Sequence, residues 1–145
     1  MIVIGSDHAG LKLKGQIMEH LRERGVEFKD IGTYTSDSCH YPDYAAAAAR
    51  AVAGGEYEKG ILVCGTGIGM SIAANKIHGV RCAHCSDVYS AKMSRAHNNA
   101  NMLALGERVV GAGLAMEIVD AFLDSEFLGG RHADRVQMMM ELEKE

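Results

Sequence analysis

The segment 64–71, CGTGIGMS, combines a thiol, three glycines and two hydroxyl groups within eight residues. The apolar run 60–63 before it is typical of a buried strand, and residues 72–76 after it are typical of a helix. Backbone N–H groups at such a turn lack partners, and the helix dipole adds partial positive charge. The turn can therefore hold an anion and favours a thiolate at Cys64. Beside free amides, this thiolate could act as a base or a nucleophile next to an oxyanion site.

Nucleotide-binding motifs fit these glycines poorly. A dinucleotide fingerprint requires Gly-x-Gly-x-x-Gly, whereas Gly65 and Gly67 are followed by Gly69, which is out of register. A P-loop would end in Gly-Lys-Ser or Gly-Lys-Thr, and this segment has no such ending. A tight turn whose glycines serve only the backbone is the simpler alternative. The thiol and the hydroxyl groups of Thr66 and Ser71 favour a small-anion site.

Further candidate groups lie in the last third of the chain. Arg131 and Arg135 are four residues apart at the start of a predicted helix, so they share one face and can grip a phosphate. Cations oppose the dipole at a helix amino terminus, so an anionic ligand explains this pair better than solvation alone. His97 follows another predicted helix, where it either caps the helix or acts as a general acid or base. Asn98 could donate to a substrate oxygen.

The segment Cys82-Ala83-His84-Cys85 resembles a zinc or redox motif only superficially. In a strand over 80–85 the two cysteines point to opposite faces. No second Cys/His pair at metal-binding spacing is evident, and a redox motif would open a helix. Buried structural thiols are the favoured interpretation, and no partner for Cys39 can be named.

Strand and helix patterns alternate along the chain. We predict strands at 2–4, 26–31, 60–64, 80–85 and 102–105, and helices at 10–24, 43–53, 72–76, 87–96, 112–123 and 132–143. This alternation indicates a three-layer α/β/α, doubly wound Rossmann-like fold with a five-stranded parallel sheet, as one domain over 1–145. Ligands of such folds bind beyond the carboxyl ends of the strands, where Asp7, His8, the segment 64–69, Ser86 and Asp87 fall.

The composition excludes several classes of protein. The formal charge of −4 leaves no basic excess for general nucleic-acid binding. No apolar run approaches the roughly 20 residues that span a bilayer, and the amino terminus lacks the pattern of a signal peptide. Four cysteines are too few for a disulfide scaffold. We therefore expect a soluble, cytoplasmic protein.

Six short segments, in order, carry a resemblance to a known family. They are 5–10 (GSDHAG), 41–44 (YPDY), 64–69 (CGTGIG), 94–98 (SRAHN), 106–111 (GERVVG) and 129–132 (GGRH). Over essentially its whole length, the chain resembles the type B ribose-5-phosphate isomerases. Their family includes allose-6-phosphate isomerase and the galactose-6-phosphate isomerase subunits.

The resemblance implies a role for each matching residue. Cys64 would be the base that moves a proton between C1 and C2, and His97 with Thr66 would help to open the sugar ring. Amides of the 65–69 loop, aided by Asn98, would hold the enediolate oxygen. Asp7 and Tyr41 would contact the sugar, while phosphate contacts would come from His8, Arg131 and Arg135, with Arg108 lining the same site. The predicted substrate-binding residues are thus Asp7, His8, Tyr41, Gly65, Gly67, Ile68, Gly69, Ser71, Asn98, Arg108, Arg131 and Arg135.

The implied reaction interconverts D-ribose 5-phosphate and D-ribulose 5-phosphate through an enediolate. The same chemistry on allose 6-phosphate or galactose 6-phosphate is one alternative, and a non-catalytic sugar-phosphate binding module is another. The resemblance implies no metal and no organic cofactor. It also implies a homodimer or tetramer with shared sites, in which His97 and Asn98 cross to the neighbouring subunit.

Overall fold

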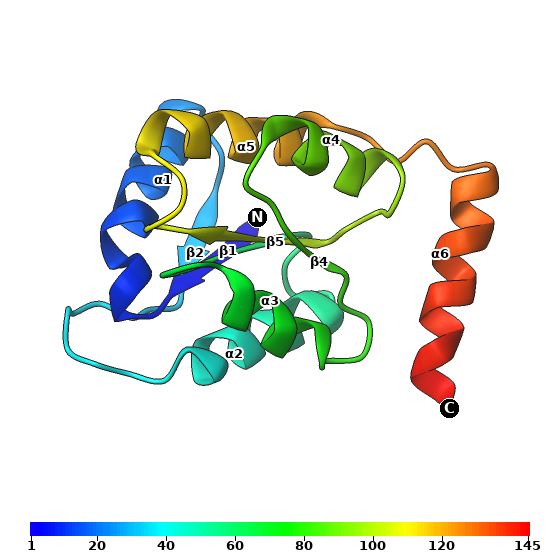
Figure 1. The fold of residues 1–145 in the computed structure, drawn as a ribbon, viewed down its shortest axis with the longest axis horizontal. Helices are drawn as coiled ribbons and strands as arrows, with labels where there is room; N and C mark the ends of the chain where they lie inside the picture. The colour runs from blue at the N-terminus through cyan, green and yellow to red at the C-terminus, as the bar shows by residue number, and fades with distance from the viewer.

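The computed structural model describes residues 1–145 and shows a five-stranded sheet between two layers of helices (Figure 1). The strands are β1 (Ile2–Ser6), β2 (Phe28–Asp30), β3 (Gly60–Cys64), β4 (Cys82–His84) and β5 (Met102–Gly106). Every strand pairing is parallel, and the strand order is β2-β1-β3-β5-β4. The predicted three-layer, doubly wound architecture is confirmed.

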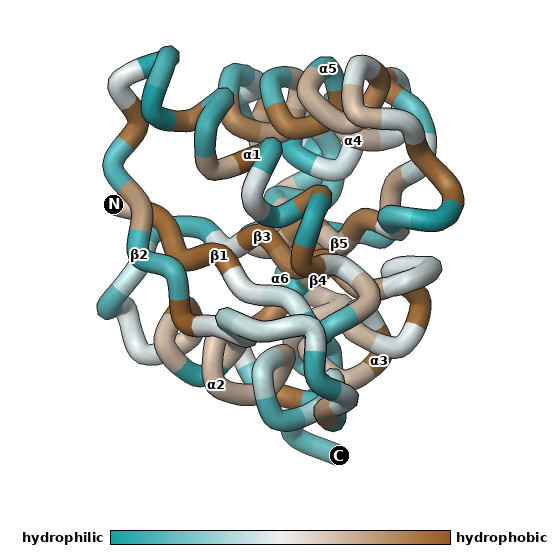
Figure 2. The backbone as a smooth tube through the Cα atoms, turned by 90° about the vertical axis from the view of Figure 1, so that its left-hand side faces the viewer, coloured by the Kyte–Doolittle hydropathy of each residue, from teal (hydrophilic) through white to brown (hydrophobic).

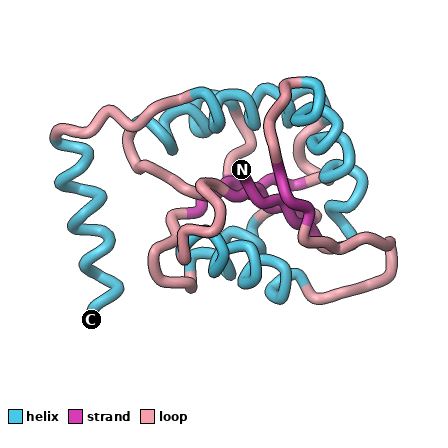
Figure 3. The backbone as a smooth tube through the Cα atoms, turned by 180° about the vertical axis from the view of Figure 1, so that it is seen from behind, coloured by secondary structure: helices cyan, strands magenta, loops and turns pink.

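The chain contains six α-helices, five of which cover the sheet. They are α1 (Leu11–Glu23), α2 (Tyr41–Ala53), α3 (Ile68–Asn75), α4 (Val88–Ala96), α5 (Ala112–Asp124) and α6 (Arg131–Glu141), with 3-10 turns at His8–Gly10 and Leu142–Lys144. Helices α1, α4 and α5 cover one face of the sheet, and α2 and α3 cover the other (Figures 1 and 3). Right-handed crossovers between parallel strands produce this division.

Each face of the sheet has its own apolar core, because successive strand residues point to opposite faces. On β1, Ile2 and Ile4 belong to the cluster that includes α1 and α5, whereas Val3 packs with α2. The small side chains of the alanine run 45–49 are largely buried against the sheet, so α2 can approach it closely. Figure 2 shows the hydrophobic strands enclosed between the two helical layers.

The edge strands are shorter than the sequence predicted. The expected strands 26–31 and 80–85 are wrong in extent, because only 28–30 and 82–84 pair with a neighbour. At the β4 edge the Asn75 side chain takes the place of a further strand: its Oδ1 accepts from the Cys82 N–H at 2.7 Å, and its Nδ2 donates to the Cys82 carbonyl at 2.9 Å. An edge closed in this way resists pairing with another chain.

The other boundaries agree with the prediction to within two residues, except that α3 begins at Ile68, four residues before the predicted start at residue 72. Helix α2 begins at Tyr41 rather than Asp43, because Pro42 fits the first turn of a helix, where its missing N–H costs no hydrogen bond. Cys82 and Cys85 pack in the cores on opposite faces of the sheet, as predicted.

Helix α6 stands beside the layered body instead of covering the sheet (Figures 1 and 3). Val136 is its only buried residue, and exposed Met138 and Met139 lie on its surface. No helix of the structure has both the length and the apolar character needed to cross a membrane.

The strand order reverses at the centre of the sheet. From β1 the chain passes first to β2 on one side and then back to β3 on the other, so the carboxyl ends of β1 and β3 flank the reversal. Ligands of open α/β sheets bind at such a point.

Candidate active site

An open cleft of about 560 Å³ lies at the carboxyl ends of β1 and β3. Its lining comes from the turn after β1, the start of α2, the glycine turn with the first part of α3, and the turn after β5. The lining residues are Asp7, His8, Ala9, Tyr41, Cys64, Gly65, Thr66, Ile68, Gly69, Ile72 and Arg108. The cleft therefore gathers most of the predicted site residues in one place.

Cys64 ends β3 and is 5% exposed. Its Sγ accepts a hydrogen bond at 3.1 Å from the N–H of Gly67, which has a φ of +84°. Only glycine adopts this positive φ without strain, and the resulting turn directs the chain toward the start of α3. The N–H donor and the amino end of α3 both stabilise negative charge on the sulfur.

The turn presents unpaired amides beside this sulfur. The carbonyls of Cys64 and Gly65 accept from the N–H groups of Glu107 and Arg108 at 2.9 and 3.0 Å, which anchors the turn to the end of β5. The amides of Gly65, Thr66 and Gly69 donate no hydrogen bond within the chain. Such amides are suited to hold an oxyanion.

Asp7 and His8 are held in place by backbone groups. Oδ1 of Asp7 accepts from the N–H groups of Ala9 and Gly10 at 3.0 and 3.1 Å, while its Oδ2 makes no hydrogen bond within the chain. The N–H of Cys39 donates to Nδ1 of His8 at 3.2 Å, a partner that the sequence did not reveal. A neutral His8 ring therefore carries its proton on Nε2, where it can donate to a ligand oxygen.

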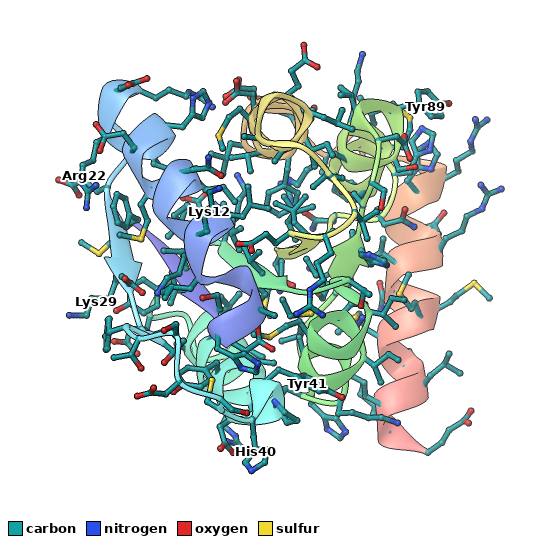
Figure 4. The ribbon with its side chains drawn as sticks, turned by 60° about the vertical axis from the view of Figure 1, so that its left-hand side comes forward. Lys12, Arg22, Lys29, His40, Tyr41 and Tyr89 are labelled. Carbon is teal, nitrogen blue, oxygen red and sulfur yellow. The ribbon has the colours of Figure 1, made fainter.

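Tyr41 forms one wall of the cleft and packs directly on the first turn of α3. Figure 4 shows its side chain at the start of α2. A Cβ added to Gly69 would lie 2.5 Å from Cε1 of the Tyr41 ring. The absence of a side chain at Gly69 therefore determines where the tyrosine sits.

We expect Gly69→Ala to displace Tyr41 and to raise the KM for the sugar phosphate that the resemblance implies about tenfold, as loss of one well-placed hydrogen bond would. Steady-state kinetics measure this effect. Gly113→Ala on α5 is the matched control, because an added Cβ there meets no atom within 4 Å. Equal KM values in the two variants would show that Tyr41 does not shape the site.

Arg108 supplies a cation to the cleft. Its Nη1 lies 3.3 Å from the position of a Cβ on Gly65, so the guanidinium rests against the glycine turn. Arg108 forms no ion pair within the chain and lines the cleft, where it remains available to an anion.

Four predicted site residues lie outside this cleft, on α6 and at the end of α4. The rings of His97 and His132 stack with centroids 4.1 Å apart, which joins the end of α4 to the start of α6. Arg131 and Arg135 flank them without ion pairs. Partial burial, with the charges of His97 and the two arginines, holds the pKa of His132 below its usual value. Asn98 lines a separate cavity of about 470 Å³ between β4 and α6. We call residues 97, 131, 132 and 135 the histidine–arginine cluster.

Three further residues have local structural contacts and do not line the cleft. Gly67 is buried behind the turn, and its carbonyl accepts from the N–H of Ser71 at 3.1 Å within the first turn of α3. The Asp87 side chain caps α4, because its Oδ1 accepts a hydrogen bond from the N–H of Ser90 at 2.6 Å.

Comparison with known proteins assigns the family. A family model described as Ribose/Galactose Isomerase matches residues 2–139. The chain belongs to this family. The chain is 54% identical to ribose-5-phosphate isomerase B of Escherichia coli, over 99% of this chain and 96% of that protein. It is 47% identical to D-erythrulose-4-phosphate isomerase of Pectobacterium atrosepticum, over 94% of this chain and 90% of that protein.

Solved structures agree with the family assignment. A structure of Clostridium thermocellum ribose-5-phosphate isomerase B superposes with a TM-score of 0.97 at 55% identity, covering 99% of this chain and 97% of that chain. Ribose-5-phosphate isomerase B of Mycoplasma genitalium with bound ribulose 5-phosphate has a TM-score of 0.95 at 42% identity, covering 99% and 96% of the respective chains. The expected resemblance is confirmed, and with it the prediction that the chain is an isomerase.

Two side chains with long-range contacts escaped the sequence analysis. Lys14 lies on α1 among apolar residues and is nearly fully buried, yet its Nζ is 2.7 Å from Oδ1 of Asp30 and 2.6 Å from the carbonyl of Thr33. It thus ties α1 to the loop after β2. The second is His84, whose Nε2 lies 2.8 Å from the carbonyl of Thr66. In both cases the partner is distant in sequence, so no local sequence pattern predicts the contact.

Proposed function

We propose that residues 1–145 form one catalytic domain that interconverts D-ribose 5-phosphate and D-ribulose 5-phosphate, with Cys64 as the base. The observation that carries the proposal is the position of the Cys64 sulfur. This sulfur accepts a hydrogen bond from the Gly67 N–H and lies in the cleft beside unpaired amides. Aldose–ketose isomerisation needs one base near two adjacent carbons and donors for an oxyanion. The cleft offers both within a few residues.

In the proposed reaction, the Cys64 thiolate removes the proton from C2 of the open-chain aldose. The released electron pair forms the C1–C2 double bond, and the carbonyl oxygen O1 becomes an oxyanion that the amides of Gly65, Thr66 and Gly69 can hold. A proton moves from O2 to O1, and the thiol returns its proton to C1 to give the ketose. Thr66, with His97, assists the earlier ring opening. Atoms and charge balance without an added reactant.

We propose that the phosphate is bound at a distance from the reacting carbons. His8 and Arg108 are the donors that this chain brings to its own cleft. Binding energy gained at the phosphate can orient C1 and C2 against the base. Asp7 and Tyr41, which line the same cleft, would contact the hydroxyl groups of the sugar.

We propose that a second copy of the chain completes the site, in a homodimer or a tetramer of such dimers. The arginine side chains of the histidine–arginine cluster form no ion pair within the chain, and the cluster does not line the chain's own cleft. Ile68 and Ile72, on the rim of the cleft, are 50% and 56% exposed. A partner subunit that covered these side chains could bring His97, Asn98, Arg131 and Arg135 to the cleft and exclude water from the enediolate.

We expect Arg131→Ala to raise the KM for ribose 5-phosphate about tenfold or more, the effect of losing one hydrogen bond to a charged group. The kcat should fall by a smaller factor than the KM rises, because the phosphate does not take part in the chemistry. Arg50→Ala, at an exposed arginine on α2, is the matched control. An unchanged KM in Arg131→Ala would remove this residue from the phosphate site.

The substrate is tested by comparing kcat/KM of the purified chain for ribose 5-phosphate, allose 6-phosphate, galactose 6-phosphate and erythrulose 4-phosphate. The proposal predicts the highest value for ribose 5-phosphate. A higher value for a six-carbon or four-carbon sugar phosphate would contradict it and would assign that substrate instead. Binding of all four without turnover would indicate a sugar-phosphate binding module.

A further inference from the structure

His84 is the last residue of β4, and its ring lies against the glycine turn. Its Nε2 is 2.8 Å from the carbonyl oxygen of Thr66. Its Cδ2 and Nε2 are also 2.8 and 3.0 Å from the position that a Cβ on Gly67 would take. The imidazole therefore packs against the Cα of Gly67, which has no side chain, and its Nε2 donates a hydrogen bond to the carbonyl oxygen of Thr66.

This hydrogen bond falls on the same peptide group that contacts the Cys64 sulfur. The Thr66 carbonyl and the Gly67 N–H belong to one trans peptide, so they point in opposite directions. The carbonyl faces the His84 donor, and the N–H donates to Sγ of Cys64 at 3.1 Å. A donor on the carbonyl polarises the peptide and strengthens its N–H as a donor.

We propose that His84 is a positioning residue for Cys64 that acts through the Thr66–Gly67 peptide. By fixing the plane of this peptide, His84 aims the Gly67 N–H at the sulfur and so stabilises the thiolate. Backbone N–H groups hold the carbonyls of Cys64 and Gly65, but a side chain holds that of Thr66. One substitution can therefore release this peptide alone. The inference rests on the proposed role of Cys64 as the base.

The test compares His84→Ala with His84→Gln, whose amide can donate from nearly the same position as Nε2. His78→Ala, at an exposed histidine outside the turn, is the matched control. Two readouts are measured: the kcat for ribose 5-phosphate, and the rate at which iodoacetamide alkylates Cys64 at neutral pH. The tryptic peptide 60–76 contains Cys64 and no other cysteine, so mass spectrometry follows this thiol separately.

We expect His84→Ala to lower both rates about fivefold, the effect of losing one hydrogen bond of ordinary strength. The KM should change little, and His84→Gln should retain most of both rates. Unchanged or faster alkylation in His84→Ala would overturn the proposal, as would equal losses in the alanine and glutamine variants. Alkylation needs no sugar, so this readout tests His84 even if ribose 5-phosphate is not the substrate.

Discussion

Replacing Cys64 by alanine lowers kcat for ribose 5-phosphate by a factor of about 10² to 10⁴, the contribution of a positioned general base. The Cys64 sulfur is the only thiol in the cleft, and it alone accepts the Gly67 N–H. Alanine removes the group that takes the C2 proton and leaves the rest of the cleft intact. The variant should still bind inorganic phosphate, because His8 and Arg108 are unchanged. Kinetics and calorimetric titration with phosphate measure the two properties separately.

Cys82→Ala is the matched control for this experiment. Burial, followed by the nearby Cys85, raises the pKa of Cys82 to about 12, so this thiol stays protonated at neutral pH and cannot serve as a base. Burial also raises the pKa of Cys85 to about 11. The control should keep most of the wild-type kcat. Full activity in Cys64→Ala would exclude Cys64 as the base.

Mixing two inactive variants, Cys64→Ala and His97→Ala, restores about a quarter of wild-type activity if the dimer is symmetric and the subunits exchange freely. The reason is geometric: in a mixed dimer, one site carries both substitutions and the other carries neither. When equal amounts of the two variants are mixed, half of the dimers are mixed, and each of these has one intact site of two. The prediction follows from the position of His97, which stacks on His132 and does not line the cleft of its own chain.

The measurement is activity after subunit exchange, with native mass spectrometry to count mixed dimers. A mixture of Cys64→Ala with Cys64→Ser is the control, and it should stay inactive because no site in it has an intact base. Mixed dimers of the first pair without recovered activity would show that Cys64 and His97 do not combine across subunits.

Local patterns in the sequence were sufficient to predict the centre of the cleft. The apolar run that forms β3, the glycine turn and the first turn of α3 are contiguous, so Cys64 and the amides beside it follow from a short segment. Asp7 and His8 come directly after β1, and parallel strands bring their carboxyl ends to the same edge of the sheet. That these residues lie at one edge of the sheet could thus be inferred without any long-range contact, whereas the strand order could not.

Contacts between distant segments account for what the sequence did not reveal. Lys14 reads as a solvated residue of α1, and only the fold brings Asp30 and the Thr33 carbonyl to its ammonium group. His84 lies in a segment that resembles a metal motif, and its partner is the turn after another strand. The edge strands are too short to be delimited by pattern alone, because pairing on one side only decides where β2 and β4 end.

The most direct test of proton transfer is to let the wild-type chain equilibrate ribose 5-phosphate and ribulose 5-phosphate in deuterium oxide and to follow the protons on C2 of the aldose and C1 of the ketose by NMR. A base that exchanges with solvent replaces these protons, so we predict that their signals decline over repeated turnovers. The decline should be absent in Cys64→Ala. Interconversion by the wild-type chain with both signals intact after many turnovers would show direct hydrogen transfer between the carbons and would contradict the account.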